Sequence, residues 1–304
     1  MSTAPSPGPG RLPATILCPV DFSPHAVRAL RHAVALAATG GGHLTVLTVN
    51  DPLLEAAAAA AGCAHTVRDQ VEAALFEILS GIPPTIPPVI PAIDVVTGEA
   101  AAEILRAATR CSADLIVMGT QGLGGARKMV FGSTAEGVVR ETTVPVLVVP
   151  DYMPEHVAFV GGAATVTFGH VVAALGLDAY DDRVATTAAA WAQASAATLT
   201  LTHICAEAPL PVWWPLSDMP MPPALEESTE VARGRVTALA ATLAGRAVVD
   251  VRRGSIAPSV AAVVRETAAG LLVVSRGGTA HRVGTMAYRV MREADVPTLV
   301  VARP

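Results

Sequence analysis

Charged residues are scarce in this chain, at 15% of its 304 residues, and Lys128 is the single lysine. The formal net charge is −5, and the basic residues form no run. Because nucleic-acid binding depends on clustered Lys and Arg side chains that neutralise phosphates, this composition argues against a nucleic-acid partner. The apolar content of 52% excludes disorder along the whole chain.

Long apolar runs are also missing. No uninterrupted apolar stretch approaches the about 18 residues that a membrane span needs, so no membrane partner is expected. Residues 1–13 lack the charged start and apolar core of a signal peptide, and their proline, glycine and serine content predicts a disordered tail. Four single cysteines, without a C-x-x-C pair, indicate reduced thiols in a cytoplasmic protein.

The common catalytic motifs are absent from the sequence. The eight histidines show no H-E-x-x-H spacing, and no G-x-S-x-G elbow is present. The stretch from Gly122 to Lys128 approaches a Walker loop, but Arg127 stands where that loop needs glycine. The same arginine spoils a G-x-G-x-x-G pattern, so neither a P-loop kinase nor a dinucleotide-binding fold of that type is supported.

The stretch 114–150 carries the strongest local pattern. An apolar run ends at Gly119, a glycine-rich loop follows, and Gly132 to Thr134 open a helix before a second apolar run at 144–149. Glycines let the backbone approach a ligand closely, and the free N–H groups of a helix N-terminus attract an anion. The pattern therefore predicts a phosphate-binding loop between two strands.

The rest of the first half alternates strands with helices. Apolar runs at 14–20, 44–49 and 93–96 predict strands, and 24–39 and 99–110 predict helices. Strands without strict alternation, separated by helices, indicate a parallel sheet that is buried on both faces. Ligands of such sheets bind beyond the carboxyl ends of the strands.

After a predicted linker at 151–169, the pattern repeats. The segments 170–178, 198–204, 249–254, 270–275 and 296–301 correspond to 14–21, 43–49, 93–98, 114–119 and 144–149. The stretch between the last two segments is four residues shorter in the second copy, 276–295 against 120–143. We therefore expect two tandem domains, 14–150 and 170–304, and a degenerate loop in the second, where Ser275 replaces Gly119.

The loop spacing identifies a family resemblance. Gly119, two residues, Gly122, nine residues, then Gly132 and Ser133, flanked by DLIVMG and VPVLVVP, resembles the ATP-binding signature of the universal stress protein (UspA-type) family. The resemblance implies an α/β fold: two tandem Rossmann-like domains of the adenine nucleotide alpha hydrolase type. Each would have a five-stranded parallel sheet, order 3-2-1-4-5, flanked by helices.

The resemblance also implies a ligand and its site. The implied ligand is ATP, with or without Mg²⁺, bound in the first domain. Asp21 would contact the ribose or adenine end, the Val49 backbone would read the adenine edge, and Arg127 would neutralise outer phosphate oxygens. The implied binding residues are Pro19, Val20, Asp21, Val49, Met118, Gly119, Gly122, Arg127, Gly132, Ser133 and Thr134; no catalytic residue or metal ligand is predicted.

Three functions stay open on the sequence. The leading one is a cytoplasmic stress-response protein that binds ATP as a regulatory module. Its two domains would pair about a pseudo-twofold axis through 144–149 and 296–301. A homodimer of tandem chains would be a further assembly. The second is a slow ATPase or phosphotransferase that uses Arg127. The third is an interaction protein without nucleotide, acting through surfaces such as Trp213 and Trp214.

Overall fold

The computed structural model describes residues 12–62, 64–120, 132–150, 155–206, 223–277 and 285–302, with 64–67, 223–228 and 285–286 described by their backbone alone. The predicted disordered tail, 1–13, therefore lies outside the described residues except for Leu12 and Pro13. Pro13 is buried and Leu12 packs against the core, so these two residues belong to the folded body.

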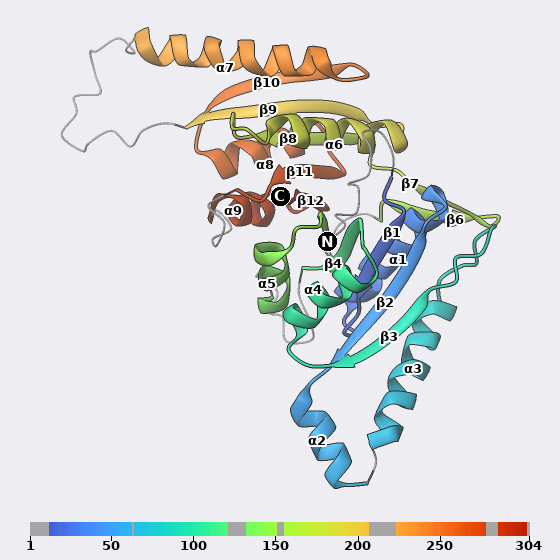
Figure 1. Cartoon of the computed structure of the whole chain (residues 1–304). Helices are drawn as coiled ribbons and strands as arrows, with labels where there is room; N and C mark the ends of the chain where they lie inside the picture. The colour runs from blue at the N-terminus through green and yellow to red at the C-terminus, as the bar shows by residue number, and fades with distance from the viewer. Residues whose placement is uncertain are drawn as a thin grey trace.

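The elements alternate along the chain as expected (Figure 1). The first half contains β1 (Thr15–Pro19), α1 (Pro24–Gly40), β2 (His43–Asn50), α2 (Pro52–Ala60), α3 (Ala64–Ser80), β3 (Ala92–Thr97), α4 (Ala100–Arg110), β4 (Leu115–Gly119), α5 (Ser133–Glu141) and β5 (Val146–Val149). The second half contains β8 (His170–Leu175), α6 (Asp181–Ala194), β9 (Thr198–Ala206), α7 (Pro223–Thr242), β10 (Ala247–Gly254), α8 (Ile256–Glu266), β11 (Leu271–Ser275), α9 (Thr285–Ala294) and β12 (Thr298–Val301).

Helix α1 shows how local sequence sets these elements. Ser23 is the N-cap residue, and its side chain accepts a hydrogen bond from the Ala26 N–H. Pro24 follows at the first helical position, where its missing N–H removes no helical bond. Gly41 ends the helix in the left-handed region, at φ 61°, which glycine adopts without a Cβ clash.

The strands form one continuous sheet of ten, in the order β10-β9-β8-β11-β12-β5-β4-β1-β2-β3. Within each half the pairs are parallel, so the predicted α/β class with parallel strands is confirmed. The two halves are wound alike, β3-β2-β1-β4-β5 and β10-β9-β8-β11-β12. Instead of two separate sheets, the halves share one, because β5 pairs with β12 antiparallel and neither keeps an open edge there.

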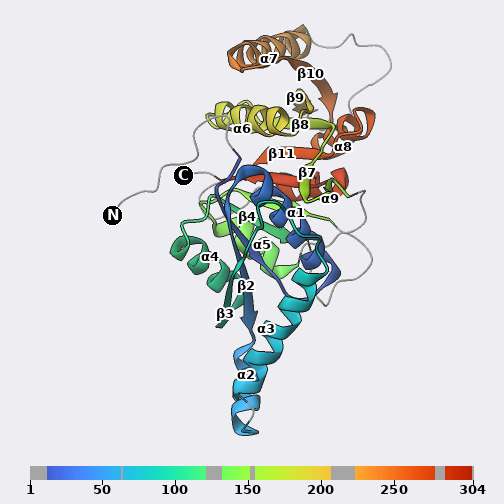
Figure 2. The same cartoon turned by 90° about the vertical axis from the view of Figure 1, so that its right-hand side faces the viewer.

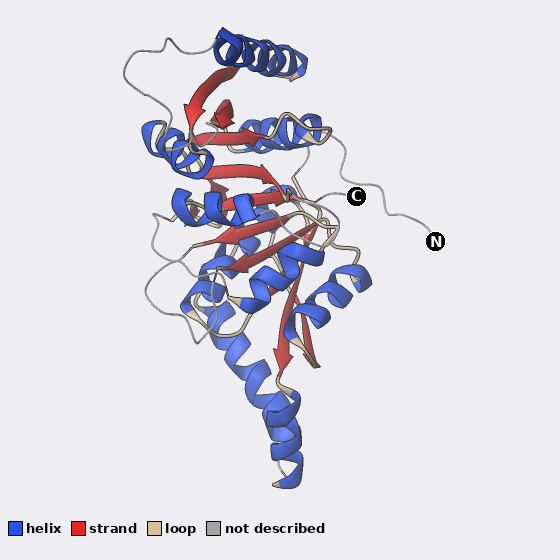
Figure 3. Cartoon of the chain, turned by 90° about the vertical axis from the view of Figure 1, so that its left-hand side faces the viewer, coloured by secondary structure: helices blue, strands red, loops and turns tan. Residues whose placement is uncertain are grey.

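Helices cover both faces of this sheet (Figure 3). One buried cluster joins the sheet to α1, α3, α6 and α7, and the other joins it to α4, α5, α8 and α9. Both clusters cross the β5–β12 seam, because Leu147 and Val149 face one cluster while Val146 and Val148 face the other. A strand buried on both faces explains the uninterrupted apolar run in the sequence.

The predicted linker contains a β-hairpin that the sequence analysis missed. Strands β6 (Val157–Val160) and β7 (Ala163–Val166) pair antiparallel across Gly161 and Gly162, both at positive φ. The hairpin packs on α1, where Arg31 lies over the Phe159 ring at 5.4 Å. The Gly-Gly pair between two short apolar stretches was the available sequence signal.

Helices α2 and α3 project from the body of the molecule (Figure 2). α2 has no buried residue, and Leu53 and Leu54 are exposed. In the described part of the chain, no helix has the length and apolar composition needed to cross a membrane.

A buried histidine lies where the hairpin meets α1. His32, 1% exposed, donates from Nδ1 to the Arg28 carbonyl at 2.9 Å, and its Nε2 has no hydrogen-bond partner in the described structure. Burial lowers the pKa of His32 from 6.5 to about 4; the hydrogen bond to the Arg28 carbonyl and the Glu155 carboxylate oppose this shift, and the charges of His156 and Arg28 add to it. His32 is therefore a core residue of α1.

Acid should therefore destabilise the fold through His32. The unfolded chain takes up a proton near pH 6.5, whereas the folded chain resists until about pH 4, so stability is lost as the pH falls through this window. We expect a loss of about 3 kcal/mol from this residue. Urea denaturation between pH 7.5 and 4 should give a flatter pH profile for His32→Leu than for the wild type. His43→Leu, at an exposed position, should keep the wild-type profile; equal profiles for all three proteins would refute the assignment.

Candidate functional site

The structure brings three predicted segments to one edge of the sheet. Strand β1 lies between β2 and β4, with Pro19 beside Leu47 in the register and Gly119 as the last residue of β4. The strands are parallel, so Asp21, Val49 and Gly119 lie at or just beyond the carboxyl ends of adjacent strands. This is the edge at which open parallel sheets bind ligands.

Asp21 forms a tight turn between β1 and α1. Its Oδ1 accepts hydrogen bonds from the Ser23 N–H at 3.1 Å and the Ser23 hydroxyl at 2.6 Å. Phe22 between them has φ 65°, a strained conformation for a side-chain-bearing residue. Asp21 itself remains exposed at the sheet edge. The turn therefore fixes a carboxylate at the rim of the site.

The apolar side of the site comes from the strands themselves. Val20 and Met118 are 3% and 5% exposed, while Pro19 and Val49 are half-buried. The Thr48 hydroxyl donates to the Val20 carbonyl at 3.1 Å and ties β1 to β2 beyond their regular ladder. These residues form a rigid base beneath the edge.

The base of the glycine-rich loop is closed by Thr120, Gly132 and His25. The Gly132 N–H donates to the Thr120 carbonyl at 2.9 Å, so the two described residues that flank the loop lie side by side. The Thr120 hydroxyl lies 3.3 Å from Nδ1 of His25 in α1. A Cβ at Gly119 would lie 2.7 Å from the His25 Cβ, so only glycine permits this approach of β4 to α1.

Helix α5 presents an N-terminus without a side-chain cap. Ser23, Asp51 and Glu99 cap α1, α2 and α4 with their own side chains, whereas Gly132 at the N-cap of α5 makes no such bond. The first N–H groups of a helix have no intrahelical acceptor and carry its positive dipole end. Within the described residues, the first turn of α5, with Ser133 and Thr134, therefore lacks the side-chain cap that α1, α2 and α4 have, and such a turn can accept an external anion.

Part of the predicted site lies outside the described residues. Gly122 and Arg127 belong to 121–131, and so does Lys128. Trp213 and Trp214, the predicted interaction surface, also lie outside. In the described ranges, no cluster of three or more His, Cys, Asp or Glu residues is arranged to hold a metal ion.

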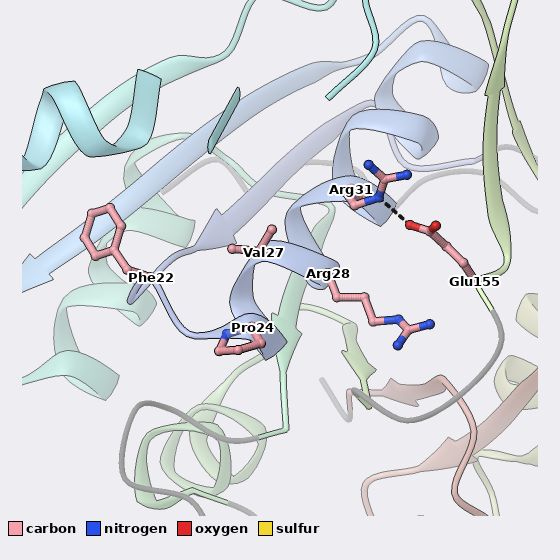
Figure 4. A pocket seen from close by; sticks show the side chains of 6 residues that line it. All are labelled: Phe22, Pro24, Val27, Arg28, Arg31 and Glu155. Carbon is pink, nitrogen blue, oxygen red and sulfur yellow. Dashed lines mark hydrogen bonds and ion pairs between the residues drawn. The ribbon is translucent and has the colours of Figure 1, made fainter. Parts of the chain in front are cut away.

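An open groove of about 510 Å³ lies beside this edge, on the outer face of α1 (Figure 4). It is lined by Phe22, Pro24, Val27, Arg28, Arg31 and Glu155. Arg31 is ion-paired with Glu155, which ties α1 to the segment preceding the hairpin. None of the predicted site residues lines the groove.

The matching edge of the second half has side-chain contacts of its own. Asp181 Oδ1 accepts from the Gly176 N–H at 3.0 Å, and Arg235 donates to the Leu177 carbonyl at 3.1 Å. Burial raises the pKa of Asp181, and the nearby Asp178 carboxylate raises it further. Asp178, the counterpart of Asp21, is likewise exposed and accepts from the Tyr180 N–H at 2.8 Å, so the second half differs in having Asp181 as an additional, buried carboxylate.

Two residues at the site were not predicted from the sequence. His25 and Thr120 contact each other at the loop base, and neither was among the predicted binding residues. The available signal for His25 was its place, two residues after the Ser23 cap and thus in the first turn of a helix that begins at the ligand edge.

Comparison with known proteins gives the class. The sequence model of the Universal stress protein family matches residues 14–150 and 167–302. A universal stress protein of Thermus aquaticus, named for the QAH/OAS sulfhydrylase 3′ region, is 35% identical over 144 residues, which cover 44% of this chain and 97% of that relative. The chain therefore belongs to the universal stress protein family.

Solved structures agree in fold. A universal stress protein of Archaeoglobus fulgidus DSM 4304 covers 96% of this chain and 97% of its own, at 20% identity and a TM-score of 0.59. A universal stress protein solved in complex with cAMP covers 45% of this chain and 96% of its own, at 23% identity and a TM-score of 0.31. The family match and the likeness to the Archaeoglobus fulgidus structure establish the family and the α/β fold for this chain.

The close contact at Gly119 predicts a specific sensitivity. Gly119→Ala places a methyl group against the Cβ and backbone of His25, so we expect a loss of about 1–3 kcal/mol in unfolding free energy. Gly234→Ala, in α7 with nothing within 4 Å, should be neutral or stabilising by about 0.5–1 kcal/mol. Chemical denaturation of both variants tests this, and equal stability of Gly119→Ala and wild type would contradict it.

Proposed function

We propose that the chain binds ATP in its first half, at the edge formed by β2, β1, β4 and α5. The observation that supports this most directly is the open N-terminus of α5, which faces the same edge as the Asp21 turn. A triphosphate needs hydrogen-bond donors and positive potential, and a helix N-terminus supplies both. Because Gly119 has no side chain, the base of the loop lies directly against α1.

Each predicted residue then has a physical role. The first N–H groups of α5, with the Ser133 and Thr134 hydroxyls, hold the phosphates. Asp21, whose hydrogen bonds from Ser23 use Oδ1, offers its other oxygen to a ribose hydroxyl. The Val49 backbone meets the adenine edge, above the apolar base of Pro19, Val20 and Met118. Gly122 lets the loop backbone approach the phosphates and Arg127 neutralises them; Mg²⁺ accompanies the triphosphate.

The proposed role is a binding module in a cytoplasmic stress response rather than a fast enzyme. The groups at the edge hold and orient a ligand: backbone N–H groups, hydroxyls and a carboxylate engaged by Ser23. The Asp21 carboxylate is fixed by two hydrogen bonds and is therefore placed to bind the ligand. Bound ATP would act by stabilising the conformation of the loop and of α5.

We also propose how the chain is organised. The family matches at 14–150 and 167–302 support two tandem domains, 14–150 and 170–304, joined by 151–169. The register of β5 and β12, with Leu147 opposite Leu299, supports a pseudo-twofold pairing of the domains within one chain. The additional carboxylate of Asp181 at the matching edge, which would repel phosphate, supports a second domain that does not bind a triphosphate.

A single substitution at Gly132 should weaken ATP binding without lowering the stability of the fold. Gly132 has φ −64° and ψ 149°, a conformation that other residues adopt at an N-cap. In Gly132→Asp the carboxylate would bind the first N–H groups of α5 and repel phosphate, so we expect ATP to bind at least about tenfold more weakly by calorimetry. Stability should stay equal or rise by a few tenths of a kcal/mol, about what a better N-cap contributes.

Gly132→Asn is the matched control. Asparagine caps the helix with a neutral oxygen of similar size, so its loss of affinity should be smaller than that of Gly132→Asp. Unchanged ATP affinity in both variants would show that α5 does not hold the phosphates, and no binding by the wild type would remove the proposal altogether.

A further inference from the structure

Helix α5 is held at its far end by the second half of the chain. Arg276 follows β11, and its Nη1 donates to the Arg140 carbonyl at 3.1 Å and to the Thr142 carbonyl at 2.8 Å. The Arg276 backbone is itself fixed, because its N–H donates to the Val301 carbonyl at 3.1 Å. The guanidinium therefore reaches across the β5–β12 seam from a rigid position.

This contact satisfies groups that α5 cannot satisfy itself. The helix ends at Glu141, so the Arg140 carbonyl has no N–H one turn further on within the helix. A cation at this end also complements the negative end of the helix dipole. Arg276 thus stabilises the same short helix whose opposite end is open to phosphate.

A second contact from the same side supports the middle of the helix. The Tyr288 hydroxyl in α9 donates to the Glu136 carbonyl at 3.0 Å. α9 and α5 lie next to each other across the seam, on the face opposite α1 (Figure 1). Tyr288 is half-buried there, and burial raises the pKa of its phenol, so the hydroxyl keeps its proton.

Arg276 makes different contacts from the residue at the equivalent position of the first half. Gly119 pairs with Val149 as Ser275 pairs with Val301, so Thr120 and Arg276 occupy equivalent positions. Thr120 makes its contacts inside its own half, whereas Arg276 leaves its half and contacts the other. The shortened loop of the second half therefore begins with a residue that serves the first half.

We infer that Arg276 and Tyr288 are positioning residues for the phosphate site of the first half: by holding α5 from across the seam, they keep its first turn aimed at the ligand. This inference rests on the proposed function for its ligand. It assigns the second half a role in nucleotide binding without a nucleotide of its own.

The test measures ATP affinity and the exchange of α5 amides in full-length variants. In Arg276→Ala we expect about fivefold weaker ATP binding by calorimetry, the size of a lost charge–dipole contact at a helix end. Mass-spectrometric hydrogen exchange over 133–141 should be faster at a temperature where both proteins are folded. Arg276→Lys should restore most of both properties, and Tyr288→Phe should show a smaller loss of each.

Arg252→Ala is the control for general destabilisation of the second half. Arg252 bonds Asp250 and Glu266 within that half and does not contact α5 in the described structure. It should lower stability while leaving ATP affinity and α5 exchange at wild-type values. If Arg252→Ala weakens ATP binding as much as Arg276→Ala, or if α5 exchange is unchanged in Arg276→Ala, the inference is overturned.

The two proposals fail separately. If the wild type binds no ATP, the proposed function is wrong. The exchange of α5 amides in Arg276→Ala still decides whether the second half positions this helix. Normal exchange would then reject the positioning role as well.

Discussion

The antiparallel pairing of β5 with β12 is the contact on which the rest of the structure depends. Each strand is four residues long and buried throughout. Either half alone would end in an apolar edge strand with unpaired N–H and C=O groups, a surface prone to association. Pairing satisfies these groups and continues both buried clusters across the seam, so the halves cannot part without opening the core on both faces.

Around this shared sheet the two halves have the same arrangement of strands but differ in the residues beyond the strand ends. The bond from Thr48 to the Val20 carbonyl has a counterpart in that between His203 and the Leu175 carbonyl, at 2.9 Å. Beyond these strands the halves differ, because Asp181 turns back onto Gly176 in the second half. A repeat can thus preserve its strands for packing while the residues at the carboxyl edges of its two copies diverge.

The sequence predicted much of this arrangement because the signals were local. Ser23 and Pro24 marked the start of α1, and the apolar runs marked strands that are buried on both faces. The contact of His25 with Thr120 could not be predicted in this way. It joins residues 95 positions apart and depends on the missing Cβ of Gly119, which periodicity does not reveal.

The hairpin and the seam contacts escaped prediction for a related reason. Strands β6 and β7 have four residues each, too few for a clear alternation, and only Gly161 and Gly162 pointed to a turn. The reach of Arg276 into α5 depends on how two copies of the repeat meet. A repeat pattern predicts each copy, but which side chains cross between copies is decided by the register of β5 and β12.

Helix α5 shows why the candidate site belongs to the whole chain. Nine residues are fewer than the about 12–15 at which an isolated helix becomes even marginally stable in water. Gly137 weakens it further by about 1 kcal/mol relative to alanine, yet lets α5 approach α4, where a Cβ would lie 2.9 Å from that of Ala101. Tertiary contacts from α4, Tyr288 and Arg276 must therefore supply the order that the helix lacks. The direction of its first N–H groups is set by both halves at once.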